Sequence, residues 1–142
     1  MQDFVHLHVH TQYSLLDGQA SVARLVDKAM QNGMKGIAVT DHGNMFGIKE
    51  FTNYVNKKNS GPKGEVKDLK KRIAGIEAGT IECEDKEAEI ADCKAKIVEA
   101  ENKLFKPIIG CEMYVARRTM DLKEGKQDQS GYHLIVLAKN ET

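Results

Sequence analysis

Histidine recurs at every second position near the start of the chain, in the segment F-V-H-L-H-V-H at residues 4–10. Successive side chains of a β-strand point to opposite faces, so a strand here would gather the imidazoles on one face and the apolar residues on the other. Such imidazoles need partners for both ring nitrogens, and protonated rings repel one another. A metal ion satisfies the row, because neutral imidazole is the commonest metal ligand. Taken alone, His6, His8 and His10 are equally compatible with a coincidence at the surface.

The residues from 11 to 58 predict alternating helices and strands. Apolar residues recur with helical spacing over residues 22–30, where Ser21 is placed to cap the helix and Gly33 to end it. Residues 36–40 are short, apolar and β-branched, as in a buried strand, and a second helix is expected over residues 46–58. The order strand, helix, strand, helix predicts parallel pairing, with the strand ends opening on the same side.

The composition changes after the N-S-G-P-K-G segment at residues 59–64, which predicts a break. Lys, Glu, Ala and Ile dominate from Glu65 to about Phe105, with a narrow apolar stripe at helical spacing. We therefore expect an inserted α-helical hairpin at 60–104, acting as a solvated structural arm or as a docking arm for a partner. Its stripe consists of Leu69, Ile73, Ile76, Ile90, Cys93, Ile97, Ala100 and Leu104.

Two further apolar segments predict strands, at residues 107–115 and 132–138. The polar, glycine-containing segment 117–131 between them is typical of a surface loop. The predicted core is therefore 1–59 together with 105–142.

Ligand-type side chains fall at the ends of these predicted strands. His42 and Asp41 follow the strand at 36–40, where parallel α/β folds place their sites, and Asp41 is a candidate ligand or second-shell acceptor. Glu112 lies in an otherwise apolar strand, and a buried carboxylate of this kind needs a cation or a hydrogen-bond partner. His133 is also compatible with a core histidine, and Asp17 with a turn or capping residue.

Together these groups predict a mixed histidine and carboxylate metal site. Such a donor set suits zinc, manganese or iron better than calcium, magnesium or copper(I). A cluster of two or three metals would bind a phosphate and favour phosphoester hydrolysis. The sequence contains no Walker loop and no dinucleotide-binding fingerprint that would indicate another chemistry.

The overall composition limits the other functions. Lys and Arg together number 21, as do Asp and Glu, so no net charge attracts nucleic acid. No apolar run is long enough for a membrane span and no secretory pattern opens the chain, which predicts a cytoplasmic protein without membrane contact. Cys83, Cys93 and Cys111 show no C-x-x-C spacing, so we expect reduced thiols.

Four segments resemble successive motifs of the PHP superfamily and occur in its order. They are H-L-H-V-H-T-Q-Y-S-L-L-D-G at 6–18, A-V-T-D-H-G-N-M-F-G at 38–47, K-P-I-I-G-C-E-M-Y-V-A at 106–116 and Y-H-L-I-V-L-A-K-N at 132–140. These motif sequences resemble the amino-terminal PHP domain of bacterial DNA polymerase III alpha subunits, the replicative C-family polymerases, more closely than histidinol phosphatase or the X-family polymerases. The resemblance implies a partial, distorted (β/α)7 barrel with parallel strands over residues 1–142, interrupted by the hairpin.

The resemblance also assigns roles to single residues. The H-x-H ligand pair corresponds to His8 and His10, the bridging glutamate to Glu112, and His6 to a second-shell position where many relatives carry Asp. The remaining family ligands correspond to Asp17, His42 and His133. The family pattern continues with a further histidine and a D-x-H pair that this sequence lacks, so we expect a truncated domain with an incomplete cluster of up to three metals.

The resemblance implies a DNA-directed DNA polymerase as the parent protein. Its partners would be DNA and deoxynucleotides, bound by polymerase domains absent from this sequence, and holoenzyme subunits such as the sliding clamp and the proofreading subunit. The PHP module itself would be a metal-dependent 3'–5' exonuclease, a non-catalytic docking module, or a free-standing phosphatase. We expect the isolated piece to be inactive and to self-associate through exposed strand edges.

Overall fold

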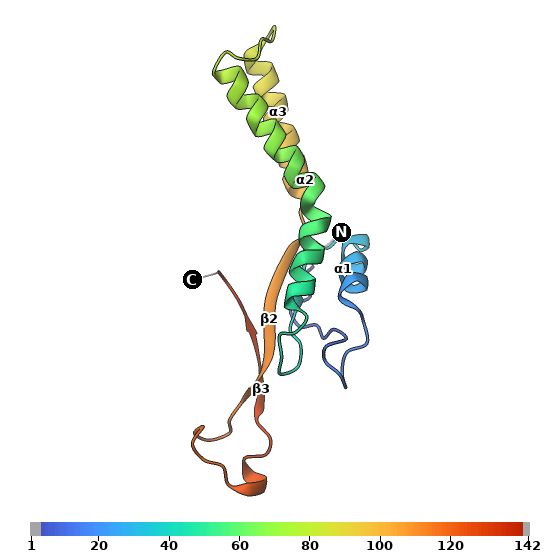
Figure 1. Ribbon diagram of the computed structural model, residues 1–142, viewed down its shortest axis with the longest axis vertical. Coiled ribbons are helices and arrows are strands. Elements are labelled where there is room, and N and C mark those ends of the chain that lie inside the picture. Colours follow the sequence, from blue (N-terminus) through green and yellow to red (C-terminus); the bar gives the residue numbers. More distant parts are fainter. Residues whose placement is uncertain (1–3, 141–142) are drawn as a thin grey trace. The chain divides into compact units, whose positions relative to one another are not determined.

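The computed structural model describes residues 4–140 and divides the chain into two compact units. The first unit takes the described residues up to Val55 and those from Lys106 onward, and the second is Asn56–Phe105. Within the described part, the elements in chain order are α1 (Val22–Gln31), β1 (Gly36–Val39), α2 (Ile48–Glu77), α3 (Lys86–Asn102), β2 (Lys106–Val115), the short 3-10 helix η1 (Gly125–Gln127) and β3 (Tyr132–Leu137) (Figure 1).

The first unit is built on a sheet with the order β1-β2-β3. β1 pairs with β2 in parallel, from Gly36 opposite Lys106 to Val39 opposite Ile109. The long connection between these two strands makes this pairing possible, because parallel neighbours need a crossover. The core of the unit is at most 3% exposed and consists of Val22, Val26, Ala29, Ile37, Ala38, Val39, Phe51 and Val55.

Helix α1 confirms the prediction from its apolar spacing. The Ser21 hydroxyl accepts a hydrogen bond from the Arg24 amide, which satisfies one of the free donors at the helix start. Gly33 follows the end of the helix with a φ of 75°, a conformation that glycine adopts without strain. Local signals therefore fix both ends of this helix.

The predicted first strand at residues 4–10 is wrong, since these described residues form no regular strand. The segment still hydrogen-bonds with β1 and its extension, because the amide of Ala38 donates to His6 O and that of Thr40 to Val9 O. The chain advances two residues from Ala38 to Thr40 but three residues from His6 to Val9. The extra residue interrupts a regular ladder, as in a β-bulge. The Thr40 hydroxyl accepts the Val9 amide at 2.9 Å in place of a backbone partner.

The expectation of parallel strands throughout is also wrong. β3 pairs with β2 antiparallel, from Gly110 opposite Leu137 to Val115 opposite Tyr132. In the described chain, the connection holds only the η1 turn and no crossover helix, so the strand returns beside its predecessor as in a hairpin. The connecting loop is mostly exposed, as predicted, and the Arg118 side chain bonds Asp128 and Glu124 across it.

The second unit contains the predicted pair of helices. Three residues of the expected stripe, Ile76, Cys93 and Ala100, are at most 1% exposed, so this part of the stripe faces inward. Gly79 has a φ of 73° just after α2 ends, and the Asp85 side chain caps α3 by accepting from the Ala88 amide. The interpretation of 60–104 as an insertion into a family domain stays a prediction.

The predicted break at residues 59–64 is wrong, because α2 continues through this segment and contains Pro62. Asn59 is 5% exposed, and its side chain bonds both the N–H and the C=O of Phe105 at 2.9 and 2.8 Å. Asn59, which the sequence suggested was part of a loop, therefore makes a long-range contact with the backbone of Phe105. Neither Gly61 nor Gly64 has a neighbour within 4 Å of an added Cβ, so both lie on an open side of the helix.

Replacing Pro62 with Ala should stabilise this helix. A proline inside a helix lacks one backbone donor and costs up to about 3 kcal/mol relative to alanine. We expect the Pro62→Ala variant to raise the melting temperature followed by circular dichroism at the helical band. The matched Gly79→Ala variant should lower it, because alanine is strained at the positive φ of Gly79. A lower melting temperature for Pro62→Ala would show that the proline stabilises the helix.

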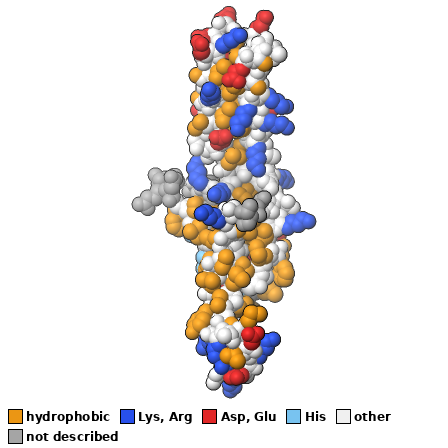
Figure 2. Space-filling model, turned by 90° about the vertical axis from the view of Figure 1, so that its left-hand side faces the viewer, with side chains coloured by type: hydrophobic (Ala, Val, Ile, Leu, Met, Phe, Trp, Pro, Cys, Tyr) orange, Lys and Arg blue, Asp and Glu red, His pale blue; other side chains and the backbone are white. Residues whose placement is uncertain are grey.

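The first unit exposes apolar side chains on one face of β2 and β3. Figure 2 shows hydrophobic side chains gathered on the surface of this unit, on the side that carries β3 in Figure 1. The strand residues that share this face and are at least 40% exposed are Met113, Val115, Tyr132, Leu134 and Val136. Among the described helices, none is long and apolar enough to cross a membrane.

Candidate metal centre

Glu112 is positioned where β2 runs on beyond the end of β1. Its amide donates to Asp41 O at 3.1 Å, and its carbonyl accepts from the Gly43 amide at 2.8 Å, which pairs it directly with His42. The parallel register thus carries a carboxylate to the chain segment that follows β1. This juxtaposition depends on long-range pairing, because the two residues are 70 positions apart.

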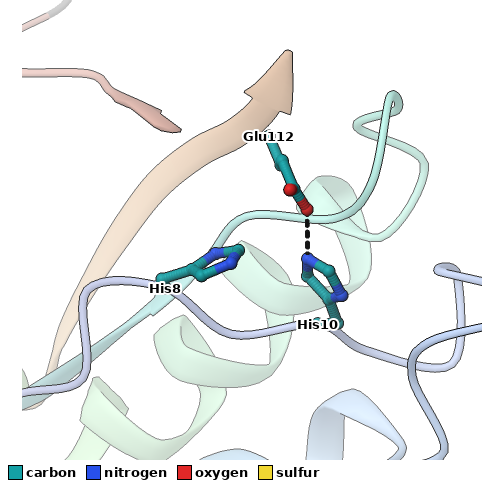
Figure 3. Close-up of side chains that lie close together, drawn as sticks. All are labelled: His8, His10 and Glu112. Atoms are coloured by element: carbon teal, nitrogen blue, oxygen red, sulfur yellow. Dashed lines mark hydrogen bonds and ion pairs between the residues drawn. The ribbon is translucent and has the colours of Figure 1, made fainter. Parts of the chain in front are cut away.

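The Glu112 carboxylate is surrounded by imidazoles from three other parts of the chain. Its Oε2 lies 2.6 Å from His10 Nε2 and 3.1 Å from His42 Nδ1, and its Oε1 lies 2.9 Å from His133 Nδ1. Figure 3 shows Glu112 pointing from β2 to the His10 ring, with His8 beside it. Burial raises the pKa of this carboxyl, but the hydrogen bonds and charges of His10 and His42 outweigh it, so the net pKa is lowered.

The donor atoms fall into two overlapping groups. His8, His10 and Glu112 form one, and His42, Glu112 and His133 form the other, with ligand atoms within 4.8 Å of one another in each. Glu112 belongs to both groups and is their most buried member, with 7% of its surface exposed. The arrangement therefore contains two adjacent groups that could each hold a cation and that share one carboxylate.

Side chains outside the two groups contact ring nitrogens of His8 and His42. His8 Nδ1 lies 2.9 Å from Thr40 Oγ1, which orients the ring and leaves Nε2 for a metal. Asp17 lies in the loop before α1 and is half-exposed. Its Oδ2 lies 3.4 Å from His42 Nδ1, which places Asp17 at the edge of the second group. His6 belongs to neither group, and its ring contacts Phe4 instead.

Asp41 belongs to neither ligand group and takes part in a buried hydrogen-bond network instead. Its carboxylate is 1% exposed and accepts from the Thr11 amide at 2.7 Å, the Thr11 hydroxyl at 2.8 Å and the Ser14 hydroxyl at 2.7 Å. The same Ser14 oxygen accepts the His42 amide at 3.0 Å. Asp41 thereby ties the loop carrying Asp17 to the backbone of His42.

Sequence reasoning named the imidazoles and carboxylates but missed the hydroxyl groups that position them. Thr11 and Ser14 are at most 2% exposed and Thr40 is fully buried, so each hydroxyl needs a partner inside the fold. The polar run T-Q-Y-S at residues 11–14, directly after the histidines, was the signal that such a network exists. Its partners could not be read from spacing, because they lie about 30 residues away.

This chain is similar in sequence to a known domain family and to several known proteins. The family profile described as PHP domain matches residues 6–97, which is more than half of the chain. The match includes His8, His10, Asp17 and His42 but ends before Glu112 and His133.

Individual relatives extend the similarity over nearly the whole chain. A DNA polymerase III subunit alpha of Treponema pallidum (strain Nichols) is 39% identical over 140 residues, covering 98% of this chain and 8% of that protein. The proteins of the same name from Borreliella burgdorferi and Aquifex aeolicus are 39% and 31% identical, covering 97% and 99% of this chain. The chain spans only 8–9% of the length of these relatives.

Proposed function

Because this chain belongs to the PHP domain family, we propose that it forms a metal-dependent phosphoesterase module of a replicative DNA polymerase of the DNA polymerase III alpha type. The observation that carries the proposal is the Glu112 carboxylate, which three imidazoles approach to within 3.1 Å. The polymerase part of the proposal rests on the relatives, which are named DNA polymerase III subunit alpha. The whole protein would carry out DNA-directed DNA synthesis in the cytoplasm.

The side chains fit a divalent metal ion. A mixed set of imidazole and carboxylate donors suits zinc, manganese or iron, and Glu112, as a member of both groups, would help to hold the ion in each. Ions held there would supply positive charge that polarises a phosphoryl group. The proposed ligands are His8, His10, Asp17, His42, Glu112 and His133, and the complete domain, with its full (β/α)7 barrel, would hold up to three ions.

The residues of this chain would prepare the site for hydrolysis. Asp41 orders the loop that carries Asp17, and Thr40 fixes the ring of His8. Each group has one exposed histidine, His8 in the first and His133 in the second, so each group is open to a substrate phosphate. The natural reaction is removal of nucleotides from the 3' end of a DNA strand, completed by groups outside this sequence.

A direct test measures nucleotide release from a single-stranded oligonucleotide labelled near its 3' end. We expect the complete natural protein to release nucleotides only with metal, and the His8→Ala, His10→Ala double variant to lose at least about 100-fold in rate. A His6→Ala variant should keep the wild-type rate, since His6 belongs to neither ligand group. The 142-residue chain alone should be inactive.

Two other functions give different results in this assay. A structural module that docks a proofreading subunit would show no release at full metal occupancy, while the double variant would only lower the melting temperature. A free-standing phosphatase would release phosphate from small monoesters and not nucleotides from DNA. The polymerase name and much greater length of the relatives favour the polymerase module.

The isolated chain should associate with itself. Its β2–β3 face exposes five apolar side chains, and β3 is at one edge of the described sheet. Unpaired edges and apolar faces promote pairing between chains. Light scattering should detect dimers or larger species at micromolar concentration, and a monodisperse monomer would contradict this expectation. In the whole protein, polymerase domains and other holoenzyme subunits, including the sliding clamp, would be the partners.

A further inference from the structure

A pocket of about 370 Å³ opens beside the metal centre and shares residues with it. Its size lies in the range of small-molecule sites. His42 and Asp17 line the pocket and also take part in the centre, so a group bound here would lie next to a group bound there. The rest of its wall is mainly apolar and aromatic, formed by Tyr13, Leu15, Leu16, Phe46 and Tyr114.

Each tyrosine ring of the pocket packs closely against a glycine, and Tyr13 also makes a polar contact. A Cβ added at Gly43 would lie 2.5 Å from the Tyr114 ring, and one added at Gly47 would lie 2.7 Å from the Tyr13 ring. Tyr13 also donates its hydroxyl to Glu50 at 2.8 Å, and this hydrogen bond raises the pKa of the phenol. These contacts give the pocket preformed aromatic sides.

Three further residues that line the pocket have side chains exposed to solvent. Phe46 is 77% exposed, Leu15 89% and Leu16 98%, although all three are large and apolar. Single exposed apolar residues are ordinary, but a group of them around a pocket marks a binding site. The residues that line the pocket include no Lys or Arg, so the pocket itself does not suit a phosphate.

We infer that this pocket holds the base of the terminal nucleotide while the adjoining phosphodiester lies at the Glu112 centre. The inference rests on the phosphoesterase function proposed above and adds to it a binding site for the unpaired base at a single-stranded end. Aromatic side chains stack on the face of any base, so they bind single strands with little sequence preference.

The polar groups of the pocket support a base without sequence readout. The Asn44 amide donates to the carbonyls of Tyr13 and His42, and its oxygen accepts from the Phe46 amide. These bonds occupy the group best suited to read the edge of a base. The pocket therefore accepts all four bases, and stacking on Phe46 provides the affinity.

The test uses a single-stranded oligonucleotide that ends in 2-aminopurine, a fluorescent base whose emission falls when it stacks. The oligonucleotide carries a phosphorothioate at its last linkage to slow cleavage, and it is added, with metal present, to the complete natural protein and to its Phe46→Ala variant. Phe4→Ala is the matched control, because Phe4 is 56% exposed and lies outside the pocket. A second oligonucleotide with an abasic terminal residue measures how much of the binding depends on the base.

We expect wild type and Phe4→Ala to quench the probe and to bind the abasic strand roughly tenfold more weakly, as for loss of one stacked base. Phe46→Ala should lose most of the quenching and the preference for a terminal base. Equal quenching by Phe46→Ala and wild type would overturn the inference, as would no quenching by either. Quenching through Phe46 without metal-dependent nucleotide release would leave the base pocket standing and refute the phosphoesterase function. Metal-dependent nucleotide release, with equal quenching by Phe46→Ala and wild type, would refute the base pocket and leave the phosphoesterase function standing.

Discussion

Replacing Glu112 with Gln should weaken metal binding by more than about 100-fold, because this one carboxylate belongs to both ligand groups. Loss of a residue that only supports a ligand typically costs 10–100-fold in metal affinity, so loss of a shared ligand should cost at least that much. Glutamine keeps the size of the side chain but not its negative charge. Calorimetric titration with zinc or manganese measures the effect.

The single variants separate the two positions. Replacing His8 with Ala should remove one position and leave the group formed by His42, Glu112 and His133. A Glu99→Gln variant is the matched control, since Glu99 is an exposed residue of α3. Unchanged affinity and stoichiometry in Glu112→Gln, with the fold intact by circular dichroism, would show that the carboxylate is not a ligand.

Replacing Asp41 with Ala should lower the melting temperature by roughly 10 °C. The Thr11 amide and the Ser14 hydroxyl would lose a buried, charged acceptor, and leaving such donors unpaired costs about 3 kcal/mol or more in the free energy of unfolding. For a domain of this size, each kcal/mol shifts the melting temperature by a few degrees, about 3 °C. Thermal unfolding of the metal-free protein measures this directly.

Asp121 provides the control for this prediction, because it is an exposed aspartate in the loop between β2 and β3. The Asp121→Ala variant should melt within about 2 °C of wild type, as is usual for surface substitutions. If Asp41→Ala behaved like Asp121→Ala, the buried network would not be what holds the loop at His42.

The elements that could be predicted were those defined by local signals. Helix α1 has an apolar stripe, a Ser21 cap and Gly33 at its end, and the structure places all three as expected. β1, β2 and β3 are apolar segments bounded by polar turns, and each lies within a residue of its predicted bounds. Neighbouring residues carry all the information that these elements need.

The errors arose where distant contacts decide the structure. Residues 4–10 have the alternation of a strand, but the Thr40 hydroxyl takes the place of a ladder partner at Val9. Residues 59–64 have the composition of a loop, yet Asn59 bonds the backbone of Phe105 and the helix continues. The antiparallel direction of β3 depends on whether a crossover helix forms in the preceding loop, which polar composition alone does not decide.

The same division applies to the candidate centre. His8, His10, His42, Glu112 and His133 could be named because their types and positions on apolar segments are unusual for a dry core. The structure brings these five together, with Asp17 at the edge, while their role as ligands stays a proposal. The neighbours Thr40, Ser14 and Tyr114 could not be named, since hydroxyl and aromatic residues are ordinary anywhere in a sequence.

The most direct test of the account is the metal content of the purified chain, measured by elemental analysis beside the His8→Ala, His10→Ala double variant. We expect at least about one ion of zinc, manganese or iron per chain in the wild type, and a clear loss in the variant. Both histidines belong to one of the two groups, so the remaining metal should reflect the group of His42, Glu112 and His133. Equal metal content in the two proteins, or none in either after incubation with each ion, would contradict a metal centre at Glu112.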